Sequence, residues 1–149
     1  RHGDTRAGVE RWWRHVIGGA ASARFHRPDS GLGLSKLAVA SLQAARKLES
    51  LIKLWDVEPA GALLSDRGDN EAYITARAGR AYALYFTRGG SVRLDLRKHP
   101  GKYDLRWIDI TTGKWGGQIS LSGGDWVKID APGKGARVAA IVKSPAAAK

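Results

Sequence analysis

Residues 91–96 read SVRLDL, and this alternation of polar and apolar side chains decides the class of fold. Val92, Leu94 and Leu96 fall on one side of an extended chain, while the polar residues between them fall on the other. A strand with one apolar and one polar face is typical of an antiparallel sheet that covers a core on one side and meets water on the other.

The same period of two recurs in short runs between residues 71 and 142. Turn signals separate the runs, such as Gly89-Gly90 and Gly123-Gly124. About seven short strands at this spacing predict a mainly β fold, an antiparallel β-sandwich. The expected strands are residues 71–77, 81–86, 91–96, 104–109, 114–121, 125–130 and 137–142. Three acids in the loop before them, Asp66, Asp69 and Glu71, are interpreted as a solvated turn.

Two amphipathic helices are expected ahead of the strands, at residues 5–18 and 35–54. The double glycine at 18–19 ends the first, and the proline at position 59 closes the segment after the second. Each helix has an apolar stripe that needs a cover: the sandwich, an absent part of the protein, or copies of the chain. The stripes are Val9, Trp12, Trp13, Val16 and Ile17, and then Leu34, Leu37, Ala38, Leu42, Ala45, Leu48, Ile52 and Trp55.

The composition excludes several kinds of site. The 149 residues include no cysteine, which excludes disulfides, thiolate catalysis and cysteine-ligated zinc. The four histidines lack metal-ligand spacing, so neither a metal nor a cofactor is expected. No apolar run is long enough to span a membrane. Because the sequence begins at Arg1 and has no methionine, we expect a trimmed or excised form of a longer product.

A resemblance enters at residues 106–113, which read RWIDITTG. This run resembles the Arg-Trp-(Phe/Ile/Tyr)-Asp-x-x-Thr-Gly signature of a C-terminal β-sandwich, often labelled collagen-binding, on certain glycoside hydrolases with an apiosidase-like or cellulase-like (β/α) barrel. Residues 80–85, 90–96 and Pro132 fall in the family's order. Residues 137–142 depart from it, because the family often has an aspartate–tryptophan pair in this last strand.

The resemblance implies a domain organisation and a function. Residues 1–58 are similar to the last elements of the barrel, with a strand at 20–26, residues 59–143 would form the accessory sandwich, and 144–149 a tail. The implied function is a non-catalytic accessory piece of a glycoside hydrolase that stabilises the barrel and contacts polysaccharide. The implied partner is the absent catalytic barrel, and the implied location is secreted or periplasmic.

The resemblance also indicates where sugar contacts would lie. Glycoside hydrolysis needs paired carboxylates, which in the resembled enzymes lie on earlier barrel strands, so no catalytic residue is predicted in this chain. Arg24 and His26 would lie at the carboxyl end of the last barrel strand, where barrel enzymes build their active sites. We therefore predict that they contact substrate in the whole protein.

Six tryptophans are present, and two are candidates for sugar binding. Sugar rings stack on exposed indoles through their apolar C–H faces. Trp115 lies among glycines, and Trp126 is expected to face outward from its strand, although simple packing at a sheet edge would explain both. The other four, Trp12, Trp13, Trp55 and Trp107, are interpreted as packing residues.

A net charge of +11 favours anionic partners. One basic group is a candidate patch for acidic polymers, or a solvated face that keeps the sheet edges unpaired. No groove-reading or RNA-binding motif is present, so nucleic acid is not expected. Two alternatives to the accessory function therefore stay open: a basic adhesion module and a self-assembling structural protein. The basic group consists of Arg88, Arg93, Arg97, Lys98, Lys102 and Arg106.

Overall fold

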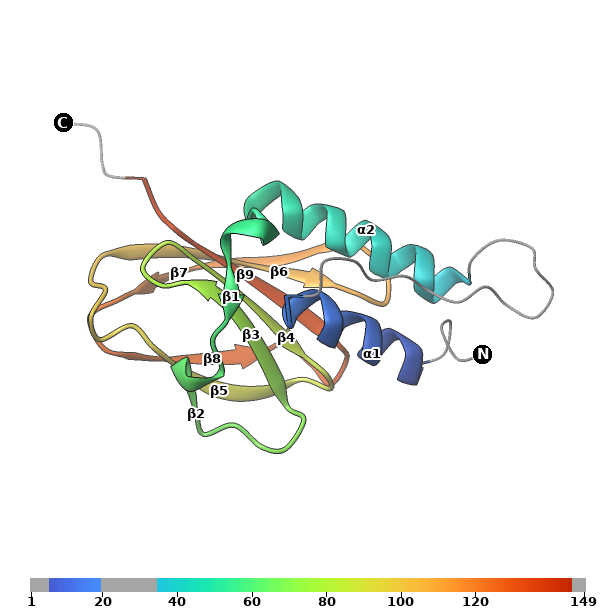
Figure 1. The fold of residues 1–149 in the computed structure, drawn as a ribbon, viewed down its shortest axis with the longest axis horizontal. Helices are drawn as coiled ribbons and strands as arrows, with labels where there is room; N and C mark the ends of the chain where they lie inside the picture. Colours follow the sequence, from blue (N-terminus) through green and yellow to red (C-terminus); the bar gives the residue numbers. More distant parts are fainter. Residues whose placement is uncertain (1–5, 20–34, 146–149) are drawn as a thin grey trace.

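The computed structural model describes residues 6–19 and 35–145, and Figure 1 shows their arrangement. Two α-helices come first, α1 (Arg6–Ile17) and α2 (Lys36–Leu51). Two single 3-10 turns, η1 (Leu54–Asp56) and η2 (Gly61–Leu63), lie near the start of the β region. The strands are β1 (Glu58–Pro59), β2 (Leu64–Ser65), β3 (Ala72–Arg77), β4 (Ala81–Phe86), β5 (Gly90–Asp95), β6 (Lys102–Asp109), β7 (Trp115–Ser122), β8 (Trp126–Ala131) and β9 (Arg137–Lys143).

The described strands form two antiparallel sheets. Sheet A has the order β1-β3-β4-β9-β6-β7, and sheet B has the order β2-β5-β8. The last strand, β9, lies between β4 and β6 and joins the two hairpins β3-β4 and β6-β7 into one sheet. The chain is therefore mainly β with antiparallel sheets and two helices, as the sequence predicts.

Facing side chains of the two sheets share one buried core. Phe86 and Trp107 of sheet A pack with ring centroids 5.7 Å apart. Val92 and Leu94 of β5 are buried in the same cluster, whereas Arg93 between them is exposed. The alternation in residues 91–96 therefore predicts correctly which side chains of β5 face the core and which face solvent.

The helices cover the opposite face of sheet A, which lies between them and sheet B (Figure 1). Trp13 of α1 is fully buried, stacks on Tyr85 of β4 with a centroid distance of 6.0 Å, and packs edge-on against Trp12. Its indole N–H donates to the Ser41 hydroxyl of α2 at 3.3 Å. Trp13 thus joins both helices to the sheet, so the β region, one of the three covers considered from the sequence, covers this side of the helices.

The predicted apolar stripe of the second helix is partly wrong. Leu37, Leu42 and Trp55 are exposed, and Trp55 most of all, at 79%. The helix ends at Leu51, and its cap residue Ile52 has extended backbone angles, so Trp55 no longer follows the helical register. Four stripe residues, Ala38, Ala45, Leu48 and Ile52, are buried as predicted, and Leu34 lies outside the described residues. The small residues Ala40, Ser41 and Ala44, which the stripe did not include, are buried as well.

No helix within residues 6–19 and 35–145 has the length and apolar character needed to cross a membrane. The expected strand at residues 20–26 and the tail beyond residue 145 lie outside the described residues.

Candidate functional site

The family-like run at residues 106–113 forms the end of β6 and the turn that follows it. Asp109 organises this turn: its carboxylate accepts hydrogen bonds from the backbone N–H and the hydroxyl of Thr111, at 2.8 and 2.6 Å, and from the N–H of Thr112 at 3.3 Å. The backbone N–H of Gly113 donates to the carbonyl of Asp109 at 2.8 Å. Trp107, two residues before Asp109 in β6, is buried in the core between the sheets. The signature residues described here therefore shape the turn after β6 and fill the core beside it.

Asp109 also binds the first residue of β9. The Arg137 guanidinium lies 3.1 Å from the Asp109 carboxylate, and both side chains are mostly buried. Burial opposes ionisation of Asp109, but the hydrogen bonds from Thr111 and Thr112 and the charge of Arg137 outweigh it and lower its pKa. The ionised carboxylate is the form that this turn requires.

We predict that Asp109→Asn removes a pH-dependent part of the stability. A carboxyl group with a lowered folded-state pKa stabilises the fold above its ordinary value of 3.8, and this stabilisation is lost as the pH falls through the folded-state pKa. The variant should be less stable by about 2 kcal/mol at neutral pH, and the difference should shrink in acid. Urea unfolding at a series of pH values measures it. Asp130→Asn is the control, because Asp130 is exposed and forms an ion pair with the exposed Lys128. A pH-independent difference for Asp109→Asn would contradict the role of its charge.

Gly113 brings the turn against α2. Its φ is +74°, and a Cβ built there would lie 2.7 Å from Oε1 of Gln43 and 2.9 Å from the carbonyl oxygen of Ala40. Only glycine combines this backbone conformation with such a close approach to another backbone. The signature glycine is therefore a point of close contact between the β region and the helix.

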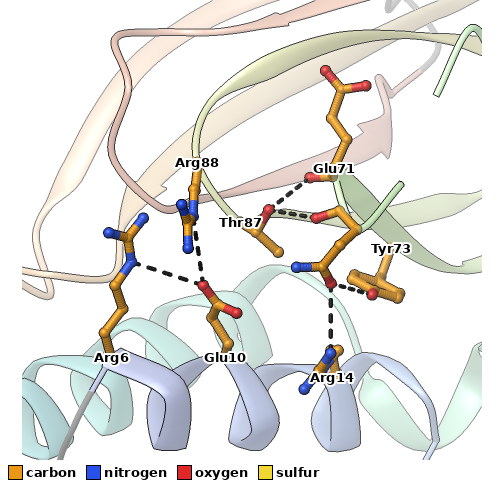
Figure 2. A network of polar contacts seen from close by, with 8 residues as sticks. Arg6, Glu10, Arg14, Glu71, Tyr73, Thr87 and Arg88 are labelled. Carbon is orange, nitrogen blue, oxygen red and sulfur yellow. Dashed lines mark hydrogen bonds and ion pairs between the residues drawn. The ribbon is translucent and has the colours of Figure 1, made fainter. Parts of the chain in front are cut away.

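A second polar contact joins α1 to the loops of sheet A, as Figure 2 shows. Glu10 lies between Arg6 and Arg88, at 3.8 and 3.9 Å from their Nε atoms. Asn70 accepts from Arg14 of the same helix at 3.5 Å and from the hydroxyl of Tyr73. The ion pairs are long, so they orient the helix more than they stabilise it.

Of the three acids before β3, Glu71 is more ordered than a solvated turn, whereas Asp66 and Asp69 are exposed. The carboxylate of Glu71 accepts from the N–H of Gly68 at 2.8 Å and from the N–H of Ser91 at 3.0 Å. The Thr87 hydroxyl donates to the carbonyl of Asn70 at 2.5 Å. For Glu71 the interpretation as a solvated turn is therefore wrong, because its side chain crosses to the start of β5. The positive φ of Asn70 gave no signal in the sequence.

A cavity of about 330 Å³ lies where α1, α2 and one end of sheet A meet. Glu10 is the single carboxylate among its described lining residues, whereas glycoside hydrolysis uses two. Tyr85 is among its lining residues, and its buried hydroxyl finds no hydrogen-bond partner among the described residues. Burial raises the pKa of this phenol strongly. The cavity is lined by Arg6, Val9, Glu10, Leu37, Tyr85, Thr87, Ile110, Thr111, Lys134, Gly135 and Ala136.

Trp126 lies on the side of sheet B that faces away from sheet A, together with two of the predicted basic residues. The guanidinium carbons of Arg93 and Arg97 lie 5.3 and 4.8 Å from its ring centroid. Arg97 forms a bidentate ion pair with Asp95, and both of its N–O distances are 3.0 Å. These hydrogen bonds lower the pKa of Asp95 to about 2. Arg93 lies 3.9 Å from a carboxylate oxygen of Asp66. The indole is therefore flanked by the protein's own cations, and carboxylates balance their charge.

Trp115 lies on the helix-facing side of sheet A, with the Arg106 guanidinium 4.1 Å from its ring centroid. The structure thus distributes the basic group over separate places: Arg106 with Trp115, Arg93 and Arg97 with Trp126, and Arg88 beside α1. Lys98 is exposed, and Lys102 donates to the Ser122 hydroxyl at 2.6 Å. Arg24 and His26 lie outside the described residues.

Sequence reasoning placed Leu42 in a stripe that needs a cover but did not include Val39, and both are exposed on one side of α2. Val39 and Leu42 lie one turn apart on the side of α2 that faces away from the sheet, with exposed fractions of 42% and 36%. Leu37 and Leu51 at the two ends of the helix, and Trp55 just beyond it, are exposed as well. Leu37 and Leu51 lie on the other side of the helix, where they line cavities against the β region. Val39 and Leu42 are called the outer face of α2 below. A signal existed: Val39 breaks the predicted stripe.

Among residues 6–19 and 35–145, no cluster of histidine and carboxylate side chains is arranged to hold a metal ion. No family model matches the sequence, and no curated protein is significantly similar to it.

Several solved structures are similar to this chain in fold, and two of them are described here. One is a glycoside hydrolase family 5 protein from Bacteroides vulgatus, with a TM-score of 0.65, 16% identity, and coverage of 93% of this chain and 36% of that one. The other is described as a glycoside hydrolase, with a TM-score of 0.61, 17% identity, and coverage of 87% of this chain and 31% of that one. The chain spans about a third of the length of these solved structures, which are related to it in fold.

Proposed function

We propose that this chain is a non-catalytic accessory piece of a glycoside hydrolase, in which α1 and α2 are the last helices of a (β/α) barrel and the two sheets form the accessory β-sandwich. The observation that carries the proposal is the outer face of α2. Val39 and Leu42 have no cover in the described structure, and exposed apolar groups gathered on one surface are typical of an interface. The rest of the barrel would cover them.

The solved glycoside hydrolases support this assignment, because their chains match both the helices and the sheets of this protein. About two thirds of each solved chain has no counterpart here, which leaves room for a barrel. In the whole protein, residues 59–143 would hold the end of the barrel in place through the turn at Gly113 and through Trp13. Arg24 and His26 would lie near the sugar, and Trp115 and Trp126 are the candidates for a polysaccharide contact.

The first test of this function is the intact mass of the protein isolated from its source. We expect a polypeptide much larger than the 16.1 kDa of these 149 residues, or this piece still bound to a barrel fragment. A lone chain of 16.1 kDa that forms large assemblies would instead favour a self-assembling structural protein.

The second test is the pair of substitutions Val39→Glu and Leu42→Glu, made together. In the 149-residue chain we expect a change of less than about 0.5 kcal/mol in the free energy of unfolding, because both side chains are exposed. In the longer polypeptide we expect a loss of at least about 3 kcal/mol, because two charges would be buried without partners. Thermal and urea unfolding of both forms measure the difference.

Ile119→Glu is the matched control, since Ile119 is also a large exposed apolar residue but lies on the edge strand β7, away from the helices. It should change the stability of both forms by the same amount. Equal effects of the α2 substitutions in the two forms would show that nothing in the longer protein covers this face.

A further inference from the structure

The two sheets have four edge strands, and three of them are poorly suited to pair with another strand. β1 and β2 have two residues each, and β1 contains Pro59. β8 carries Lys128 and Asp130. Short strands, proline and charged side chains are the usual features that keep sheet edges from pairing.

The fourth edge strand, β7, has none of these features. It runs for eight residues with the sequence WGGQISLS, which contains neither a charged residue nor a proline. Residues 116–120 are exposed, and Ile119 is 50% exposed. β6 is its one partner in sheet A, so its other side presents unpaired backbone groups. Within the described chain, β7 is the edge that is open to strand addition.

The register shows which backbone groups face outward. Gly123 donates to the carbonyl of Gly101 directly opposite, at 2.7 Å, and the pairing continues without a shift from Lys102↔Ser122 to Arg106↔Gln118. In an antiparallel ladder, hydrogen-bonded and non-hydrogen-bonded pairs alternate. The N–H and C=O groups of Ser122, Ser120 and Gln118 therefore face away from β6, two residues apart, as a pairing strand requires.

We propose that β7 is a docking edge for an extended peptide segment that carries acidic side chains. The side chains beside the edge determine the sign of this preference. Lys102 lies opposite Ser122, Arg106 lies opposite Gln118, and Lys114 directly precedes the strand. Asp104, opposite Ser120, is the one carboxylate in the paired stretch from Lys102↔Ser122 to Arg106↔Gln118. Asp109, further along β6, is paired with Arg137. A second copy of the chain suits this edge less well, because each copy has a net charge of +11.

The probe is a synthetic peptide with blocked ends, of the same length as β7, that alternates valine with glutamate. A matched peptide alternates valine with lysine. We expect the acidic peptide to shift the backbone amide signals of residues 116–122 in two-dimensional NMR and to slow their hydrogen exchange. Binding should weaken as salt is added, and the basic peptide should bind far less.

Three substitutions at Ser120 separate the backbone contribution from the charge contribution. Ser120→Pro removes an N–H that faces away from β6, and it should therefore abolish most of the binding. Proline is tolerated at edge positions of this kind, so the strand should still form. Ser120→Glu keeps the N–H and should weaken binding about threefold, while Ser120→Lys should strengthen it by a similar factor. Lys128→Gln on β8 lowers the net charge by the same one unit as Ser120→Glu and should leave binding unchanged.

Ser120→Glu decides the result if the proline variant misfolds. The proposal is overturned if the acidic peptide fails to shift the amides of β7, or if the two peptides bind equally well. It is also overturned if the same amides shift with protein concentration alone, which would identify a second copy as the occupant. None of these results depends on a barrel covering α2.

Discussion

Trp13→Ala is expected to lower the free energy of unfolding by about 4 kcal/mol, the largest effect of any single substitution proposed for this chain. Trp13 is fully buried between α1, α2 and sheet A, so its loss leaves a cavity at the point where all three meet. It also removes the stacking on Tyr85 and leaves the Ser41 hydroxyl without its indole donor. Urea unfolding followed by circular dichroism measures the change.

Trp55→Ala is the matched control for this prediction. It removes the same side chain from a site that is 79% exposed, and it should change the stability by less than about 0.5 kcal/mol. Hydrogen exchange adds a local readout, because the amides of α1 and α2 should exchange faster in the Trp13 variant. Similar effects of the two substitutions would mean that the helices contribute little to the stability of the β region.

Gly113→Ala is expected to be the second most damaging substitution, at about 3 kcal/mol. Part of the loss comes from the positive φ, which costs an alanine about 1 to 2 kcal/mol. The rest comes from overlap of the new methyl group with the carbonyl of Ala40 and the side chain of Gln43, which forces the turn and the helix apart.

Gly133→Ala separates the two contributions to the Gly113 result. Gly133 has a φ of +67°, close to that of Gly113, but the nearest atom to its added Cβ is a side-chain nitrogen of Arg137 at 4.0 Å. This variant should lose only the conformational part, about 1 to 2 kcal/mol. If both alanine variants lose the same stability, the close contact between the turn and α2 is not important.

The sequence predicts the strands well because their signal is local. The bounds of β4, residues 81–86, are those expected from the alternation, and β5 differs by one residue at each end. Pairing is not local: β9 inserts between β4 and β6, and no pattern within any of these strands specifies its neighbours. The sequence predicts a mainly β fold, but the strand order required the structure.

The inward side of α2 was harder to predict for a physical reason. Hydrophobicity alone favours Leu42 over Ala40 as a core residue, yet Ala40 is buried and Leu42 is exposed. Near the turn at Gly113 the helix backbone comes so close at Ala40 that a large side chain has little room there, whereas Leu48 is buried further along the same helix. A rule that equates large apolar residues with the core therefore fails where two backbones approach closely.

The candidate site shows the same limit. Trp126 and Arg93 were predicted on an outward face, and both lie there, but the sequence did not indicate that Asp95 and Asp66 would balance the charge. Trp115 and Arg106 form a similar pair on the other sheet. Their adjacency depends on the pairing of β6 with β7, in which Ile108 lies opposite Trp115 after a shift in register.

The central strands of sheet A, β4 and β9, are buried on both of their faces, and this has a consequence for protein engineering. A fusion that transplants residues 59–143 alone onto another enzyme would carry Ala83, Tyr85 and Val138 to the surface without their cover. Such a graft should be poorly soluble. The smallest transferable cassette includes α1 and α2, so any host enzyme must accept two helices together with the sheets.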